Sequence, residues 1–150
     1  ADLYTANDLD KTSTHAALVI GPSHGGVEEQ MSGFWANQLA ERGYVAIAFD
    51  PSYKGDSSGE PRFVSSPEIF VEDFSASVDF LGTLPYVDRE RVGICGSGGF
   101  GLGATRIDTR LKAAVTASMY DIGENYRNGW AHSWTDADRH AEAERLNALR

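Results

Sequence analysis

A short apolar stretch of this chain ends abruptly in small residues that surround one cysteine and one serine. The stretch, residues 91–104, is Arg-Val-Gly-Ile-Cys-Gly-Ser-Gly-Gly-Phe-Gly-Leu-Gly-Ala, and a helix-compatible segment begins within it. Small residues beside a reactive side chain are typical of a sharp strand-to-helix turn, because such a turn crowds the backbone. The free N–H groups and the positive dipole end of the following helix can stabilise an oxyanion. The stretch therefore predicts a turn that presents a nucleophile.

Length and composition restrict the class of protein. The chain has 150 residues, the size of one domain, and 41% of them are hydrophobic, which is ordinary for a globular protein. The net charge is −9 and no run of Lys and Arg occurs. Nucleic acid is therefore not expected as a partner, because phosphate binding needs basic clusters.

A single cysteine, Cys95, excludes an internal disulfide and a cysteine-based zinc site. No apolar run approaches the roughly 18–20 residues of a membrane span, so no membrane partner is expected. The N-terminal segment has neither the basic nor the apolar region of a signal peptide, and we therefore expect a cytoplasmic location. We expect no metal and no cofactor.

Strand-like and helix-like segments alternate along the chain. The apolar run 16–20 ends in Gly-Pro and is typical of a buried strand, and Pro67 suits the first turn of a helix. The expected strands are 16–20, 44–49, 92–95 and 112–118, and the expected helices are 31–42, 67–81, 99–106 and 136–150. This alternation predicts an α/β fold of three layers, with helices on both faces of a mostly parallel sheet.

The C-terminal part differs in composition from the rest. Residues 125–134 are polar and aromatic, and Thr135 followed by Asp138 is typical of a helix cap. The charged helix that follows has only a thin apolar stripe. We therefore divide the chain into a core, residues 1–124, and a helical tail or partial cap, residues 125–150, that packs on the core.

Two residues compete for the nucleophile position. The pattern small-x-nucleophile-x-small fits Cys95 and Ser97 equally well. Cys is the better intrinsic nucleophile, and a helix N-terminus would lower its pKa, whereas Ser needs a base at hydrogen-bond distance. The structural alternatives are a buried strand residue for Cys95 and a helix N-cap for Ser97.

The loops that follow the strands supply the other candidates, because ligands bind at the carboxyl edge of a parallel sheet. Backbone N–H groups near Ser23 and Gly25, after the first strand, and near Gly96 and Gly98 would hold an oxyanion. The candidate bases are His24, His132 and His140, and His24 is the best placed. Asp121 could orient a base. Asp50 is expected instead to accept N–H groups of the turn that follows it.

The same residues permit a different function. Gly96, Gly98 and Gly101 form G-x-G-x-x-G after a strand and before a helix, and Asp121 lies 20 residues beyond Gly101. That spacing is typical of a dinucleotide-binding fingerprint. The motif follows the third expected strand rather than the first, which argues against this alternative.

Several ordered motifs resemble those of α/β-hydrolases of the dienelactone-hydrolase-like group. They are Gly25–Gln30, Ala48–Arg62, Gly93–Gly99 and Ser118–Ile122, within a resemblance that runs from about residue 1 to residue 140. The resemblance implies a reduced α/β-hydrolase core and hydrolysis of small uncharged esters or lactones through a covalent acyl-enzyme, without a cofactor. It favours Cys95 as the nucleophile, because the Gly-Ile-Cys-Gly turn of that group usually places Cys there.

The chain departs from this group in three ways. It lacks the opening hairpin, and it lacks the later strands that carry the acid and the histidine of the triad. The approach from Asp88 to Cys95 is about three residues shorter than usual in the group, which favours Ser97. A catalytically weak or inactive remnant that binds a small molecule or a partner is therefore an alternative. The missing strands also leave a sheet edge, for which we expect a homodimer or coverage by the tail helix.

Overall fold

The computed structural model describes residues 1–97, 99–119 and 121–149. The chain forms two compact units, Ala1–Met119 and Tyr120–Arg150, and each is described here by itself. The first unit contains a five-stranded sheet in the order β1-β3-β2-β4-β5. β1 is antiparallel to β3, and the other pairs are parallel. The strands are β1 (Asp2–Tyr4), β2 (His15–Gly21), β3 (Val45–Ala48), β4 (Val87–Ser97) and β5 (Leu111–Ala117).

The four predicted strands are present, and two features of the sheet differ from the prediction. β1 was not expected, because it has three residues and no apolar pattern; its contribution is backbone pairing with β3. β4 is longer than the predicted 92–95, because the charged residues 88–91 continue the strand beyond its buried part. A register shift between His15 and Ala17 of β2 accommodates this extension.

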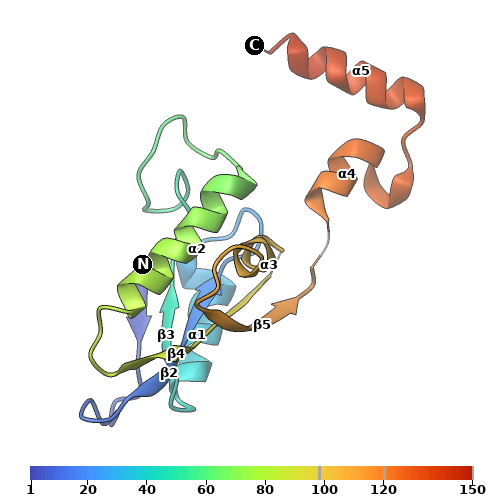
Figure 1. Ribbon diagram of the computed structural model, residues 1–150. Helices are drawn as coiled ribbons and strands as arrows, with labels where there is room; N and C mark the ends of the chain where they lie inside the picture. The colour runs from blue at the N-terminus through green and yellow to red at the C-terminus, as the bar shows by residue number, and fades with distance from the viewer. Residues whose placement is uncertain (98, 120, 150) are drawn as a thin grey trace. The chain divides into compact units, whose positions relative to one another are not determined.

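Helices cover both faces of the sheet (Figure 1), which confirms the predicted three-layer α/β/α arrangement. α1 (Gly33–Ala40) follows a π-helical turn, η1 (Glu28–Ser32), and lies on one face. α2 (Pro67–Leu81) and α3 (Phe100–Thr105) lie on the other. Pro67 occupies the first turn of α2 as predicted, and the Ser66 hydroxyl caps that helix by accepting the N–H of Ile69 at 3.4 Å.

The two faces of the sheet are packed unequally. On the α2 side, Phe74, Val78 and Leu81 pack on Val19 and Ile94 as part of a large buried cluster. On the α1 side the buried cluster among the described residues is smaller: it contains Ile20, Ala36, Ala46 and Ala48, with partly buried side chains such as Leu39 packed against it. β5 is an edge strand and is exposed over almost its whole length, with 63% of Val115 accessible. The expectation of a second copy at this edge stays a prediction.

Two buried carboxylates lock the loops that follow β2 and β3. The N–H of Glu28 donates to Oδ1 of Asp50 at 2.8 Å, and the N–H of Asp50 donates to Oε2 of Glu28 at 3.1 Å. Oδ2 of Asp50 also accepts the N–H of Asp56 at 2.8 Å. This last bond confirms the role predicted for Asp50 in the turn that follows it. Because both side chains are buried, losing either one would leave buried N–H groups unpaired.

Gly55 lies against the Asp50 carboxylate. Its φ is +49°, and a Cβ added there would lie 1.8 Å from Oδ2 of Asp50. We expect Gly55→Ala to lower the free energy of unfolding by about 3 kcal/mol, from backbone strain and from displacement of the carboxylate. Gly43 has a φ of +88° with nothing near its added Cβ, so Gly43→Ala is the matched control and should cost about 1 kcal/mol. Urea unfolding measures the free energy of unfolding of both variants. Equal losses would contradict the role of the hydrogen bonds between Glu28 and Asp50 in holding the two loops together.

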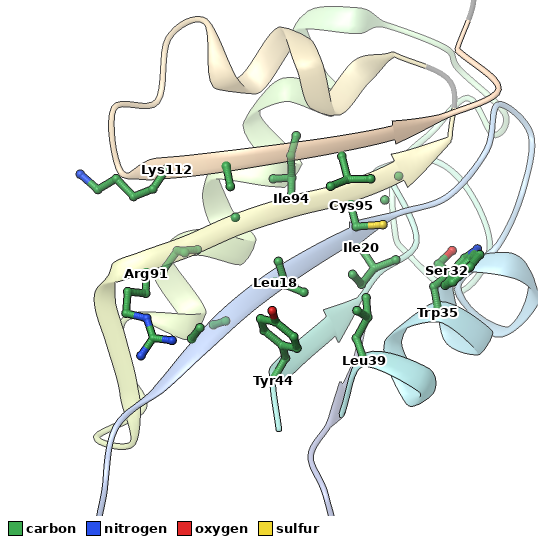
Figure 2. Close-up of a pocket in the computed structure, with 18 of the residues that line it drawn as sticks. Leu18, Ile20, Ser32, Trp35, Leu39, Tyr44, Arg91, Ile94, Cys95 and Lys112 are labelled. Carbon is green, nitrogen blue, oxygen red and sulfur yellow. The ribbon is translucent and has the colours of Figure 1, made fainter. Parts of the chain in front are cut away.

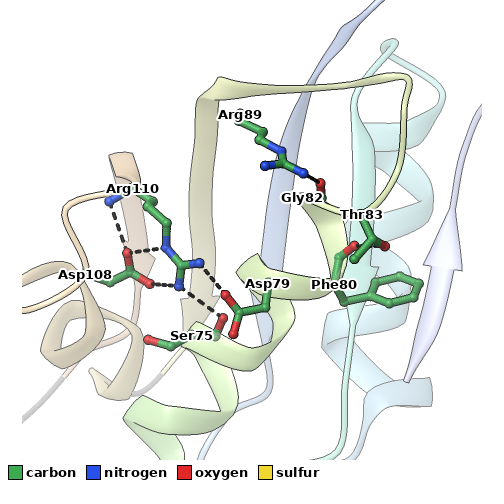
Figure 3. Close-up of polar contacts among 8 residues, drawn as sticks. All are labelled: Ser75, Asp79, Phe80, Gly82, Thr83, Arg89, Asp108 and Arg110. Carbon is green, nitrogen blue, oxygen red and sulfur yellow. Dashed lines mark hydrogen bonds and ion pairs between the residues drawn. The ribbon is translucent and has the colours of Figure 1, made fainter.

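A second polar network joins α2 to the loop before β5 (Figure 3). Arg110 donates from Nε and Nη2 to Asp108 at 2.9 and 2.7 Å, and from Nη1 to Asp79. Asp108 is 8% exposed, whereas the side chain of Asp79 is 70% exposed. The hydrogen bonds from Arg110 lower the pKa of Asp108 to about 2, from its usual 3.8.

We expect this pKa shift to appear in the acid stability of the protein. The folded-state pKa lies below the unfolded value, so the contribution of Asp108 is complete above about pH 4 and is lost as pH falls toward 2. Asp108→Asn should therefore lower stability by about 2 kcal/mol at pH 7, and by less at pH 3. The exposed Asp79→Asn is the control, with a loss below about 1 kcal/mol. Equal effects of both variants in denaturant titrations would contradict the assignment.

The second unit contains α4 (Ile122–Asn128), a 3₁₀ turn (Trp130–His132) and α5 (Asp136–Asn147). The predicted cap is confirmed, because Thr135 and Asp138 form a reciprocal capping box at the start of α5. α5 has no buried residue. The predicted packing of this segment on the core stays a prediction. Among the described residues, no helix combines the length and the apolar character of a membrane span.

Candidate active site

The candidate site lies at the carboxyl edge of the parallel strands. Residues 22–27 follow β2, residues 49–66 follow β3, and the turn between β4 and α3 follows β4. Gly21 and Gly96 pair across β2 and β4 at this edge. The first and third of these loops therefore begin beside each other, which is the arrangement that the sequence predicts.

The turn after β4 has the predicted strand-to-helix form. β4 ends at Ser97 and α3 begins at Phe100, with Gly99 in the left-handed region at φ +85°. Ser97 pairs with Ala117 of β5 and is the last residue of the strand. The side chain of Ser97 and the whole of Gly98 lie outside the described part of the structure. The backbone therefore turns after Ser97, two residues beyond Cys95.

Cys95 lies within β4 rather than on the turn. It pairs with Ile20 of β2 and Val115 of β5, and its side chain packs on the α1 side of the sheet. Burial raises the pKa of its thiol above the usual 9.0. The lowered pKa that the sequence predicted is therefore wrong for this position. The reason is that two further strand residues separate Cys95 from the turn, so its surroundings are apolar side chains of the sheet and of α1.

The Cys95 thiol opens into an apolar groove of about 620 Å³ on this face (Figure 2). Sheet residues form its floor, and Trp35 and Leu39 of α1 form one wall. Ser32, at the end of η1, also lines the groove, and its buried hydroxyl has no hydrogen-bond partner in the described structure. The floor residues include Leu18, Ile20, Gly93, Ala113 and Val115.

His24 bonds to a residue that the sequence analysis did not single out. Its Nε2 lies 3.3 Å from Oγ of Ser65, and its ring lies 6.1 Å from the ring of Phe100 at the start of α3. Burial lowers the pKa of His24, and the nearby ammonium of Lys54 lowers it further. Ser65 is 41 residues away in sequence. The Gly-, Ser- and Pro-rich composition of residues 50–66 was the only signal for it, and that composition does not identify a residue.

The loop after β2 forms a tight turn around the predicted oxyanion-binding residues. The N–H of Gly26 donates to the carbonyl of Ser23 at 2.8 Å, and Gly25 has a φ of +80°. Ser23 and Gly25 are both exposed. Their role in binding an oxyanion stays a prediction.

The other candidate catalytic residues, Asp121, His132 and His140, lie in the second unit. Each has a polar partner that is near it in sequence. Oδ1 of Asp121 accepts the N–H of Glu124 at 2.8 Å and so caps α4. His132 lies 3.4 Å from the carboxylate of Glu124, and His140 lies 3.4 Å from that of Glu144. Their catalytic roles stay predictions. Within the described residues, no cluster of His, Cys, Asp and Glu could hold a metal ion.

No protein-family model matches the chain. Curated relatives share significant sequence with this chain. The uncharacterized protein PA2218 of Pseudomonas aeruginosa is 50% identical over 137 residues, 89% of this chain and 37% of the relative. The uncharacterized protein YcjY of Escherichia coli is 43% identical over 141 residues, 92% of this chain and 46% of the relative. Thiohydrolase aneE of Aspergillus aculeatus is 32% identical over 103 residues, 67% of this chain and 32% of the relative.

Solved structures show that the similarity to known proteins extends to the fold. The crystal structure of PA2218 matches with a TM-score of 0.93 at 45% identity, over 97% of this chain and 46% of that chain. The α/β hydrolase GrgF from Penicillium sp. sh18 matches with a TM-score of 0.73 at 21% identity, over 97% of this chain and 50% of that chain. The chain therefore has the fold of an α/β-hydrolase core. It spans less than half the length of the curated relatives named above.

The reactivity of the half-buried Cys95 thiol tests whether this side chain lies within the strand or on the turn. We expect its alkylation by iodoacetamide at pH 8 to be slower than that of glutathione, because the thiolate is scarce and half-buried. The rate should still rise as pH passes 9, the usual pKa of a thiol. Mass spectrometry of the intact protein follows the reaction. A rate that levels off below pH 8 would mean an activated thiolate and would contradict this placement.

Proposed function

We propose that this chain carries the nucleophile-bearing part of a hydrolase that cleaves small uncharged esters, thioesters or lactones through a covalent acyl-enzyme. The turn between β4 and α3 carries the proposal, because it lies at the carboxyl edge of an α/β-hydrolase core. Two relatives with partial coverage support acyl chemistry by their names, thiohydrolase aneE and the acyltransferase drtE of Aspergillus calidoustus. The dienelactone-hydrolase-like group remains our proposal for the subfamily.

Ser97 is our choice of nucleophile over Cys95. Ser97 is the last residue of β4, directly before the turn, whereas Cys95 lies inside the strand on the α1 face. In the proposed reaction the Ser97 oxygen attacks the carbonyl carbon, its proton passes to a base, and a tetrahedral intermediate forms. The leaving group takes that proton as it departs. Water then attacks the acyl group and gives a proton to the base, and Ser97 regains a proton as the acid leaves. The backbone N–H groups near Ser23 and Gly25 and those of the elbow are the proposed oxyanion donors.

The rate of this reaction depends on the base. His24 has its Nε2 on Ser65, so it is not held toward the elbow. Oxyanion stabilisation and binding without a complete triad can still leave about 10³–10⁴-fold acceleration over water. We therefore propose a slow esterase activity for this chain, with the base of the full reaction supplied by groups other than His24.

Ester hydrolysis by single and double variants tests the proposal. We expect Ser97→Ala, compared in chains that also carry Ser65→Ala so that the elbow serine alone is tested, to lower kcat/KM for 4-nitrophenyl acetate at least about tenfold, through loss of the acyl-enzyme route. Cys95→Ala should change it less than about twofold, because the thiol faces the groove. An acetyl thioester, followed with a thiol reagent, extends the test to the second substrate class.

The competing outcomes are distinct. Loss of activity in Cys95→Ala alone would move the nucleophile to Cys95 and retain the elbow. Unchanged turnover in both single variants and in the double variant would sink the elbow proposal. It would favour a non-catalytic remnant that binds a small molecule or a partner.

A further inference from the structure

Three side chains outside the elbow form a continuous hydrogen-bonded chain. Nζ of Lys54 lies 3.0 Å from Oγ of Ser65, and Oγ of Ser65 lies 3.3 Å from Nε2 of His24. Lys54 and Ser65 come from the loop after β3, and His24 comes from the loop after β2. The lock between Asp50 and Glu28 holds these two loops together. This chain of side chains is therefore fixed by the fold and does not depend on the turn after β4.

Lys54 is the unusual member of the chain. It is only 6% exposed, and among the described residues it makes no ion pair within 4.0 Å. Its ammonium lies 5.0 Å from the centre of the Phe70 ring, and its hydrogen-bond acceptor is Ser65. A buried lysine usually has a carboxylate partner. Here the positive charge is directed at a hydroxyl oxygen.

One of the two neutral tautomers of His24 makes this chain a proton relay. An ammonium group only donates, so Oγ of Ser65 accepts from Lys54. The Ser65 hydroxyl hydrogen is then free to point at Nε2 of His24, which accepts it and leaves the ring proton on Nδ1. Burial and the nearby Lys54 both lower the pKa of His24, so the neutral ring that this arrangement needs is the favoured form. Each side chain hydrogen-bonds to the next, so the three are arranged to transfer a proton and not to surround a bound anion.

We propose that Ser65 is a second nucleophile, with His24 as its general base and Lys54 as the cation that stabilises its developing negative charge. Oγ of Ser65 attacks the carbonyl carbon of an ester, and its proton passes to Nε2 of His24. The bond to the leaving alkoxide breaks, and that oxygen takes the proton from His24. Water then attacks the acyl group, again giving a proton to Nε2, and Ser65 regains its proton as the acid leaves.

The Ser65 side chain is exposed and is not among the residues that line the small aromatic cavity beside His24 and Lys54. That cavity holds about 10 Å³, room for about one water molecule, and the rings of Phe49, Phe70 and Phe100 enclose it. The acyl group is therefore expected to approach Ser65 from the exposed side, and the substrate class is carboxylic esters. This activity is independent of the proposed elbow.

Covalent labelling tests the inference on the full chain. A fluorophosphonate probe forms a P–O bond to an activated serine as the P–F bond breaks, and the serine proton passes to the base. After digestion, mass spectrometry locates the phosphonyl group. We expect it on Ser65, and we expect His24→Gln to slow this labelling by about 100-fold. Lys54→Met removes the ammonium but keeps an unbranched apolar side chain, and it should slow the labelling at least about tenfold.

Two variants separate chemistry from folding. Ser65 is exposed, so Ser65→Ala should keep the circular dichroism spectrum and lose the label at this position. Ser58 is an exposed serine of the same loop, and no hydrogen bond of its side chain is seen in the described structure. Ser58→Ala is therefore the matched control and should label at the unchanged rate. Hydrolysis of 4-nitrophenyl acetate by the same variants, in chains that carry Ser97→Ala, measures the ester hydrolysis due to Ser65.

Each alternative result overturns the inference in a recognisable way. Labelling at Ser97 alone overturns it and supports the elbow. Labelling of Ser65 that is unaffected by His24→Gln or Lys54→Met overturns the relay. An absence of label from every serine overturns it, and the ester assay of Ser97→Ala then decides the elbow separately.

Discussion

Reciprocal hydrogen bonds between Glu28 and Asp50 determine the shape of the carboxyl edge. Each side chain accepts the backbone N–H of the other residue, and both carboxylates are buried. Because the two residues follow different strands, these bonds fix the loop after β2 against the loop after β3. Without them, the loops would lose their buried hydrogen-bond partners and the geometry of His24 and Ser65 would not be defined. The chemistry proposed for this edge depends on this lock.

The alternation of side chains along β4 is the second constraint. Successive residues of a strand point to opposite faces, so Ile94 faces α2 and Cys95 faces α1. The strand continues to Ser97 before the chain turns. The thiol therefore lies against apolar groups, where burial raises its pKa, and the serine at the end of the strand is next to the turn. A shift of one or two residues in the length of a strand is enough to change which side chain is at a site.

The α1 face explains why the chain has a large apolar groove. α1 packs on β3 and on its neighbours β1 and β2, and the floor of the groove continues over β4 and β5, where no helix among the described residues of the first unit covers that face. The groove combines apolar residues with a Ser32 hydroxyl for which the described residues supply no hydrogen-bond partner. It is a different environment from the aromatic cavity beside His24 on the other side of the sheet edge, and the two should not be treated as one site.

The sequence by itself determined the class of fold, the order of the main strands and helices, the cap of α5 and the role of Asp50. These follow from local rules: apolar runs, helical periodicity and the hydrogen-bonding habits of Pro, Thr and Asp near turns. Only the tertiary structure decided that Cys95 faces a groove, because the end of β4 is set by pairing with β2 and β5. Only the structure placed Ser65 and Lys54 beside His24. Contacts between loops far apart in sequence depend on buried hydrogen bonds such as those of Glu28 and Asp50, and no local pattern encodes that distance.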